Sequence, residues 1–134
     1  MQSMKASIIF LLTIFSLSSL ISTPAKSELI PVKTTENNDE KLYIDTDSIT
    51  SNKNFVEASV KVKFKTPLKS GTSSSAIKWK VNCSSRSYMH NGFNSYDLNG
   101  SFLWGDREPT GWSLVQPGAV NEDVYNLMCN QSRR

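Results

Sequence analysis

The sequence predicts one α+β domain: an antiparallel β-sheet of about five to six strands, with a C-terminal α-helix packed on one face and tied to it by a disulfide. The 134 residues allow a single domain. Two segments, Val56–Lys65 and Ile77–Cys83, alternate apolar and polar residues with a period of two, which is typical of half-buried antiparallel strands. Between Val120 and Met128 the apolar spacing changes to that of an amphipathic helix.

Residues 1–27 have the composition of a secretory signal peptide. Lys5 precedes an apolar run, Ser7–Ile21, and Ala25 and Ser27 fit a small-residue cleavage site. The run is shorter than the roughly 20 apolar residues that a transmembrane helix needs, so a retained anchor is the less favoured alternative. We expect export to the periplasm, the cell surface or the medium, with no transmembrane segment after cleavage.

The charge balance gives no support for nucleic-acid binding. The chain has 15 basic and 12 acidic residues, and loss of Lys5 and Lys26 with the leader brings the net charge from +3 to about +1. A strongly positive field therefore has to be local.

The chain after the leader is predicted to have three parts. We expect a flexible N-terminal segment at 28–40, because Lys33–Glu40 has little to bury, an ordered domain at 41–130, and a C-terminal tail at 131–134. At the start of the domain, Leu42–Ile44 is a short strand candidate, and the Asp, Thr and Ser residues after it favour a turn.

The two long alternating strands are predicted to pair as a hairpin across a Pro/Gly/Ser-rich loop. Pairing Val62 with Trp79 keeps both apolar faces on one side. In that register Lys63 lies opposite Lys78, and in the next allowed register it lies opposite Lys80. Like charges directly opposite each other are destabilising, so either register carries a cost on the polar face.

Shorter strands separated by turns are predicted in the C-terminal half. Asn91-Gly92 and Asn99-Gly100 are tight-turn candidates, since both residue types accept a positive φ. Ser84–His90 either extends the second long strand or begins a third. The other strand candidates are Phe93–Leu98, Ser101–Trp104 and Trp112–Val115, with a loop at Gly105–Gly111.

A helix is predicted after Pro117-Gly118. Its apolar stripe consists of Val120, Val124, Leu127 and Met128. Both cysteines lie beyond the leader, and an even cysteine count in an exported domain predicts a disulfide between Cys83 and Cys129. Cys129 lies to the Tyr125 side of the stripe, which suggests that the last helical turn unwinds to form the bond.

Catalysis and metal binding find little support in the residue types. His90 is the single histidine, and a Cys83–His90 nucleophilic pair would need a free thiolate, which the expected disulfide removes. Asp45 and Asp47 resemble the start of a calcium loop, but the glycine and closing glutamate of that loop are missing. We therefore expect a non-enzyme with no cofactor and no metal.

Five lysines on the polar phase of the two long strands suggest a binding surface. We call this set the lysine face: Lys61, Lys63, Lys65, Lys78 and Lys80. One interpretation is a solvated surface that keeps the protein soluble. The other is an electrostatic site for a polyanion or an acidic protein surface.

The three tryptophans have different expected environments. Trp79 lies on the buried phase of its strand, whereas Trp104 and Trp112 are candidates for an exposed binding edge, where Trp is enriched. Because Trp79 is expected to point into the core, it offers no aromatic surface beside the lysines, and we do not expect single-stranded nucleic acid to stack on the lysine face.

An ordered set of motifs resembles the bacterial surface-adhesin protein E family over Lys41–Asn130. The motifs are Tyr43–Ile49, Asn82-Cys83, Tyr96–Gly100, Trp112 with Pro117-Gly118, and Tyr125–Cys129. The resemblance implies a bacterial protein with an antiparallel sheet and a C-terminal helix tied by the Cys83–Cys129 disulfide. It also implies binding of host extracellular-matrix and plasma proteins through a basic region that corresponds here to Pro67–Cys83, although Ser70–Ser75 is neutral in this chain.

We therefore expect an exported, non-enzymatic binding protein that contacts host matrix or plasma proteins, or polyanionic glycans, through the lysine face. The alternative is a periplasmic inhibitor or immunity-type protein that blocks a partner enzyme, and a hydrolase is a distant third. A homodimer is compatible with either of the first two.

Overall fold

The structure is a computed structural model that describes residues 28–32 and 39–132. The predicted signal peptide lies outside the described residues, as do residues 33–38 and the last two residues of the predicted tail. The elements are β1 (Leu29–Pro31), β2 (Glu40–Asn52), β3 (Phe55–Phe64), β4 (Ser74–Asn82), β5 (Ser87–Tyr96), β6 (Phe102–Pro109), β7 (Ser113–Leu114) and α1 (Val120–Gln131).

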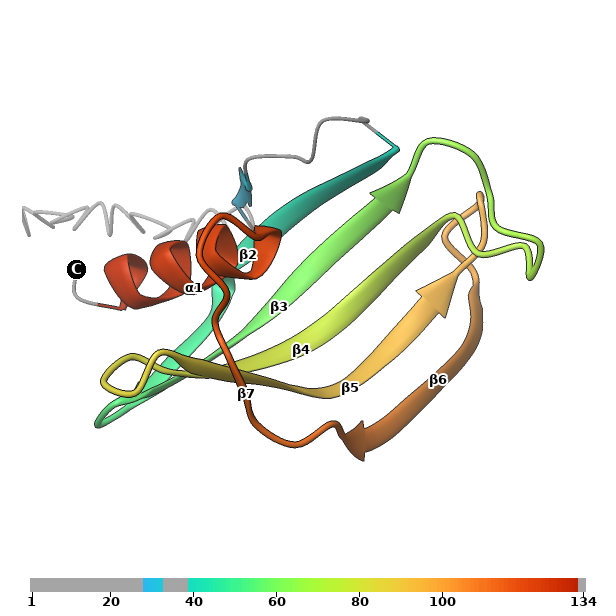
Figure 1. Cartoon of the computed structure of the whole chain (residues 1–134). Coiled ribbons are helices and arrows are strands. Elements are labelled where there is room, and N and C mark those ends of the chain that lie inside the picture. Colours follow the sequence, from blue (N-terminus) through green and yellow to red (C-terminus); the bar gives the residue numbers. More distant parts are fainter. Residues whose placement is uncertain (1–27, 33–38, 133–134) are drawn as a thin grey trace, which may run out of the picture.

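The strands form one antiparallel sheet in which β1 to β6 lie side by side in sequence order (Figure 1). The short strand β7 returns to pair with the first residues of β5, where Ser87 lies opposite Leu114. Helix α1 lies on one face of the sheet and contacts β2, β3 and β4 (Figure 1). The predicted fold class is therefore confirmed, with six strands in the main path and β7 as the seventh.

The core lies between α1 and the apolar phase of β2, β3 and β4. On the sheet side it includes Leu42, Ile44, Val56, Ala58, Val60, Val62, Trp79 and Val81. The alternation of β3 explains this arrangement, because successive side chains of a strand point to opposite faces. Trp79 is only 6% exposed, which confirms its predicted place in the core.

The N-terminal boundary of the ordered domain differs from the prediction. Leu29–Pro31 forms strand β1 instead of a flexible segment, and Ile30 lies opposite Ile44 of β2. The backbone N–H of Val32 donates to the carbonyl of Leu42 at 2.9 Å, and the Val32 side chain is buried. The apolar residues before position 33 thus add a strand to the sheet, an outcome that the polar run after them obscured.

The register of the central hairpin also differs from the prediction. Val62 lies opposite Ser75 rather than Trp79, while both apolar faces remain on the same side. The reason is the connection between the strands, which closes with a hydrogen bond from Phe64 N–H to the carbonyl of Ser73 and buries Thr72. The predicted lysine–lysine pairs across this ladder are therefore wrong.

Asn91-Gly92 is not a turn. It lies inside β5, which runs without a break from Ser87 to Tyr96. Gly92 has φ +100°, and a Cβ there would lie 2.8 Å from the carbonyl oxygen of Asp106 in β6. The predicted loop that begins at Gly105 is likewise mostly strand, because β6 pairs with β5 as far as Pro109. The Asn99-Gly100 turn is confirmed, with Gly100 at φ +80°.

Helix α1 stays intact through the disulfide, so the predicted unwinding is wrong. Cys129 is bonded to Cys83 while the helix continues to Gln131. The buried face of the helix is shifted from the predicted stripe. Tyr125 and Cys129 are buried beside Val124 and Met128, whereas Val120 and Leu127 are only partly buried. The Tyr125 hydroxyl also donates to the carbonyl of Cys83 at 2.7 Å, which adds a second link at the same place.

Candidate binding surface

The sheet face opposite α1 is lined by the polar phase of the strands. On β3 this phase consists of Glu57, Ser59, Lys61 and Lys63, which alternate with the buried residues of the core. No part of the helix covers this face (Figure 1). Its side chains are therefore open to a partner, and two regions of it differ in chemistry.

The first region is a group of four lysines where β2 begins and β3 ends. We call it the lysine cluster: Lys41, Lys61, Lys63 and Lys65. Lys41 lies directly opposite Lys63 across the β2–β3 ladder, and Tyr43 lies opposite Lys61. Lys41, Lys63 and Lys65 border one hollow of about 410 Å³. The ammonium of Lys63 lies 5.5 Å from the centre of the Tyr43 ring, a cation–π contact that holds the charge near the sheet.

The remaining two residues of the lysine face lie apart from this cluster. Lys78 is opposite Ser59, and Lys80 is opposite Glu57. The ammonium of Lys80 lies 5.0 Å from the centre of the Phe55 ring. The carboxylate of Glu57 reduces the positive field around Lys80, so the field of this face is strongest at the lysine cluster.

Lys41 is the member of the cluster that sequence reasoning missed. A signal was present, because Lys41 and Tyr43 alternate with the apolar residues Leu42 and Ile44. That pattern places Lys41 on the same face as the other lysines once β2 pairs with β3. What the sequence did not supply was the register that sets Lys41 beside Lys63.

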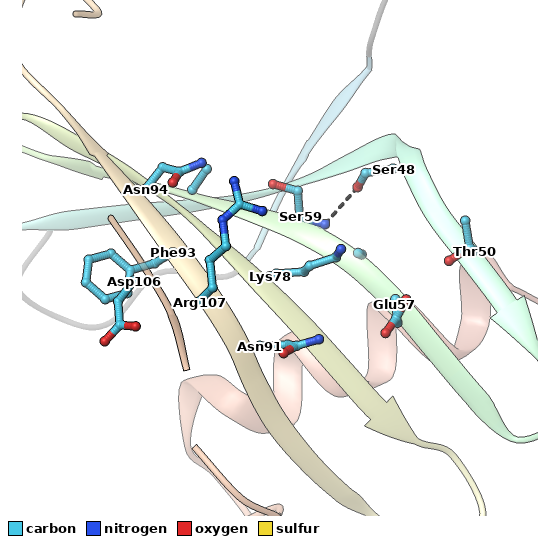
Figure 2. Close-up of a pocket in the computed structure, with 13 residues that line it drawn as sticks. Ser48, Thr50, Glu57, Ser59, Lys78, Asn91, Phe93, Asn94, Asp106 and Arg107 are labelled. Atoms are coloured by element: carbon cyan, nitrogen blue, oxygen red, sulfur yellow. Dashed lines mark hydrogen bonds between the residues drawn. The ribbon is translucent and has the colours of Figure 1, made fainter. Parts of the chain in front are cut away.

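The second region is a hollow of about 460 Å³ farther along the same face, which we call the polar hollow (Figure 2). Three irregular ladders meet around it. The β2–β3 pairing shifts between Asp45 and Thr50, the β4–β5 pairing shifts at Lys78, and the β5–β6 pairing shifts at Gly92. Bulges bend a sheet and turn side chains in new directions, so their coincidence here makes the hollow.

Polar and charged residues from five strands line the polar hollow. They are Ser48 and Thr50 of β2, Glu57 and Ser59 of β3, Lys78 of β4, Asn91 and Asn94 of β5, and Asp106 and Arg107 of β6. In Figure 2 the guanidinium of Arg107 extends over the sheet towards Ser59 and Asn94, whereas the carboxylate of Asp106 points away from them. Sequence reasoning did not select Arg107, because it placed this residue in a loop.

His90 lies on the opposite side of the sheet from these groups, in an aromatic cluster. Its ring centre is 4.6 Å from that of Trp79 and 5.7 Å from that of Tyr88. Burial lowers the pKa of His90 below its usual value of 6.5, which favours the neutral ring. The histidine thus packs as an aromatic residue of this cluster.

Cys83 is held in the disulfide, so it is not the nucleophile of a cysteine–histidine pair. Among the residues that the structure describes, no group of three or more His, Cys, Asp or Glu side chains is placed to hold a metal ion. Within the same residues, no helix has the length and apolar character needed to span a membrane.

Comparison with known proteins gives a consistent result. The family model of surface-adhesin protein E matches residues 30–130. Two solved structures of Haemophilus influenzae protein E have TM-scores of 0.65 and 0.62 at 17% and 18% identity. Both alignments cover 81% of this chain, and they cover 91% and 89% of the other chain.

A third structure, of protein E from non-typeable Haemophilus influenzae, has a TM-score of 0.59 at 14% identity, with 77% of this chain and 78% of that chain covered. A search of curated protein sequences finds no significant match. The structural likenesses show a shared fold, and the family match covers almost all of the sheet and the helix. The chain therefore belongs to the surface-adhesin protein E family.

Proposed function

We propose that this chain is an exported, non-enzymatic binding protein that holds acidic groups of its partner at the lysine cluster. The partner class is a host matrix or plasma protein with an acidic surface, or a polyanionic glycan. Membership of the surface-adhesin protein E family supports a role in adhesion. The observation that carries the choice of surface is the direct opposition of Lys41 and Lys63 at an exposed end of the sheet.

That opposition has a physical cost. Two like charges directly across a ladder repel each other, and Lys61 and Lys65 raise the positive field around them. An anionic partner relieves this repulsion when it binds, because each carboxylate or sulfate reduces the field at several ammonium groups. Lysine suits a partner with irregular charge positions, since its ammonium is a mobile point charge with three donors.

The same chemistry predicts strong salt dependence. Exposed charges are screened over about 10 Å at 0.1 M ionic strength. Binding through the lysine cluster should therefore weaken steeply as salt is added, and most of the change should appear in the association rate. A partner held mainly by apolar contacts would lack this response.

The test compares two double variants of equal charge. Lys41→Gln/Lys63→Gln removes the opposed pair, while Lys53→Gln/Lys80→Gln removes two lysines elsewhere and serves as the matched control. Binding to immobilised heparin and to purified matrix proteins is measured at low and high salt. We expect the first variant to bind about tenfold more weakly at low salt, and the control to bind within about twofold of the parent protein.

Equal binding by the two variants would show that the cluster has no special role. Location provides a second, independent test, because an adhesin has to reach the outer surface of its cell. Fractionation of the native host with a tagged protein should place the protein at the surface. Detection in the periplasm alone would contradict the adhesin proposal and favour the periplasmic inhibitor.

A further inference from the structure

We propose that the polar hollow binds a sugar residue that carries a carboxylate group. This inference goes beyond the lysine cluster, since the hollow lies along another part of the sheet and contains Lys78 but no member of that cluster. It stands whether or not the lysine cluster binds a polyanion. It is supported by the position of the charges, by the neutral groups between them and by the size of the space.

The anionic part of the ligand is indicated by two cations from different strands. Lys78 comes from β4 and Arg107 from β6, and both line the hollow. In Figure 2 the Arg107 guanidinium extends across the strands instead of away from the sheet. A guanidinium presents parallel N–H donors that match the two oxygens of a carboxylate. Asp106 is turned away and its carboxylate accepts a hydrogen bond from the N–H of Glu108, which leaves the cations available.

The neutral part of the ligand is indicated by groups that both donate and accept hydrogen bonds. Asn91 and Asn94 contribute side-chain amides, Ser59 and Thr50 contribute hydroxyls, and Glu57 contributes a carboxylate acceptor. A site for a bare anion needs donors alone. Acceptors such as Glu57 suit a ligand that also presents hydroxyl groups, and a sugar acid combines these hydroxyls with a negative charge.

The size of the hollow agrees with this ligand. Its volume of about 460 Å³ lies within the range of small-molecule sites, which is about 300–1,000 Å³. Small residues, Ala76 and Gly92, lie beneath the hollow, so that the polar groups surround a shallow space. Such a space admits one sugar unit, either at the end of a glycan or within it.

Two of the wall residues are held in place by their surroundings. The Ser48 hydroxyl donates to the carbonyl of Asp45 at 2.6 Å and accepts from the N–H of Ser59 at 2.8 Å, so it fixes the β2 bulge. Asn94 lies close to Gly105, where a Cβ would come within 2.5 Å of the Asn94 amide oxygen. A glycine at this position therefore leaves room for the amide.

The experiment is a titration of the full-length exported protein followed by two-dimensional amide NMR, with glucuronic acid as the probe. Glucose supplies the same hydroxyls without the charge, and inorganic phosphate supplies an anion without the hydroxyls. We expect saturable shifts for amides of the hollow with glucuronic acid, and affinities at least about tenfold weaker for glucose and phosphate.

Two variants test the assignment of the charges. Arg107→Gln should weaken glucuronic acid binding about tenfold while the spectrum away from the hollow stays that of the parent protein. Lys53→Gln, which removes a lysine that borders neither the hollow nor the lysine cluster, should leave the affinity unchanged. Equal shifts with phosphate would overturn the sugar assignment in favour of a simple anion site. Absence of saturation with glucuronic acid, or unchanged binding in Arg107→Gln, would overturn the site.

Discussion

Replacement of Cys83 and Cys129 by alanine should remove a large part of the stability of this domain. The two cysteines are 46 positions apart, and the chain-entropy relation for a loop of that size gives about 4 kcal/mol near 25 °C. Domains of this kind have free energies of unfolding of about 5–15 kcal/mol in total. Alanine is chosen because it adds no hydroxyl to a buried site, where an unpaired polar group would add its own cost.

The assay is urea unfolding of the oxidised protein and of the double variant, followed by circular dichroism. The variant should still fold in water, because Val124, Tyr125 and Met128 keep α1 on the sheet through buried contacts. The Tyr125 hydrogen bond to the carbonyl of residue 83 involves the backbone, so it also survives the substitution. We expect a lower midpoint and a steeper slope, since the uncrosslinked unfolded chain exposes more surface.

The parent protein in the presence of a reducing agent is the control, and it should unfold with the midpoint of the double variant. A loss of stability below about 1 kcal/mol would refute the entropic argument, because that argument assigns about 4 kcal/mol to loop closure. A variant that is unfolded in water would refute the claim that buried contacts alone hold the helix.

Two further predictions concern the aromatic cluster and the sheet edge. Because the pKa of folded His90 lies below 6.5, the unfolded chain binds more protons between the two pKa values, and the free energy of unfolding should fall as pH drops below about 6.5. Urea unfolding at pH 7.5 and 5.5 should show a smaller fall in His90→Phe, and an equal fall would contradict this assignment. Strand β6 pairs only with β5 in the described part of the chain, and Phe102 and Trp104 on it are 62% and 50% exposed, so we expect self-association through this edge. Sedimentation should show a dimer that Trp104→Thr weakens, and a monomer at every concentration would contradict the proposal.

Features that depend on local periodicity could be predicted from the sequence. The period of two in β3 assigned Val56, Val60 and Val62 to the core, and all three are buried. The apolar stripe from Val120 to Met128 predicted a helix there, and the observed helix is Val120–Gln131. These features are predictable because the same residues that form the pattern also bury the surface, so no distant part of the chain has to be known.

The register of the central hairpin could not be predicted in this way. Any shift by two residues keeps the apolar face buried, so periodicity leaves several registers equally good. The choice between them is made by Thr72, which is buried inside the connection, and by the hydrogen bond between Phe64 and Ser73. A polar residue in a loop rich in Ser and Gly carries no sign that it will be buried.

The Asn91-Gly92 pair illustrates a second limit. The same two residue types accept the positive φ of a tight turn and that of a bulge within a strand. Which one forms depends on whether another strand runs beside the glycine. Here β6 does so, with the carbonyl of Asp106 against the position that a Cβ would occupy. A contact between two segments this far apart cannot be read from either of them.

The register has a consequence for function that the sequence pattern concealed. If Val62 had paired with Trp79, Lys78 would have faced Lys63, and the lysine face would have formed one positive patch. The observed pairing places Lys78 opposite Ser59, next to the bulges, where it shares a hollow with Arg107. The charges are thereby divided between two sites on the same face of the sheet, the lysine cluster and the polar hollow. Salt should weaken binding at the cluster more than binding in the hollow, because the hollow also offers uncharged hydrogen-bonding groups, which salt does not screen. A salt titration of heparin and of glucuronic acid on the same protein therefore separates the two sites without any substitution.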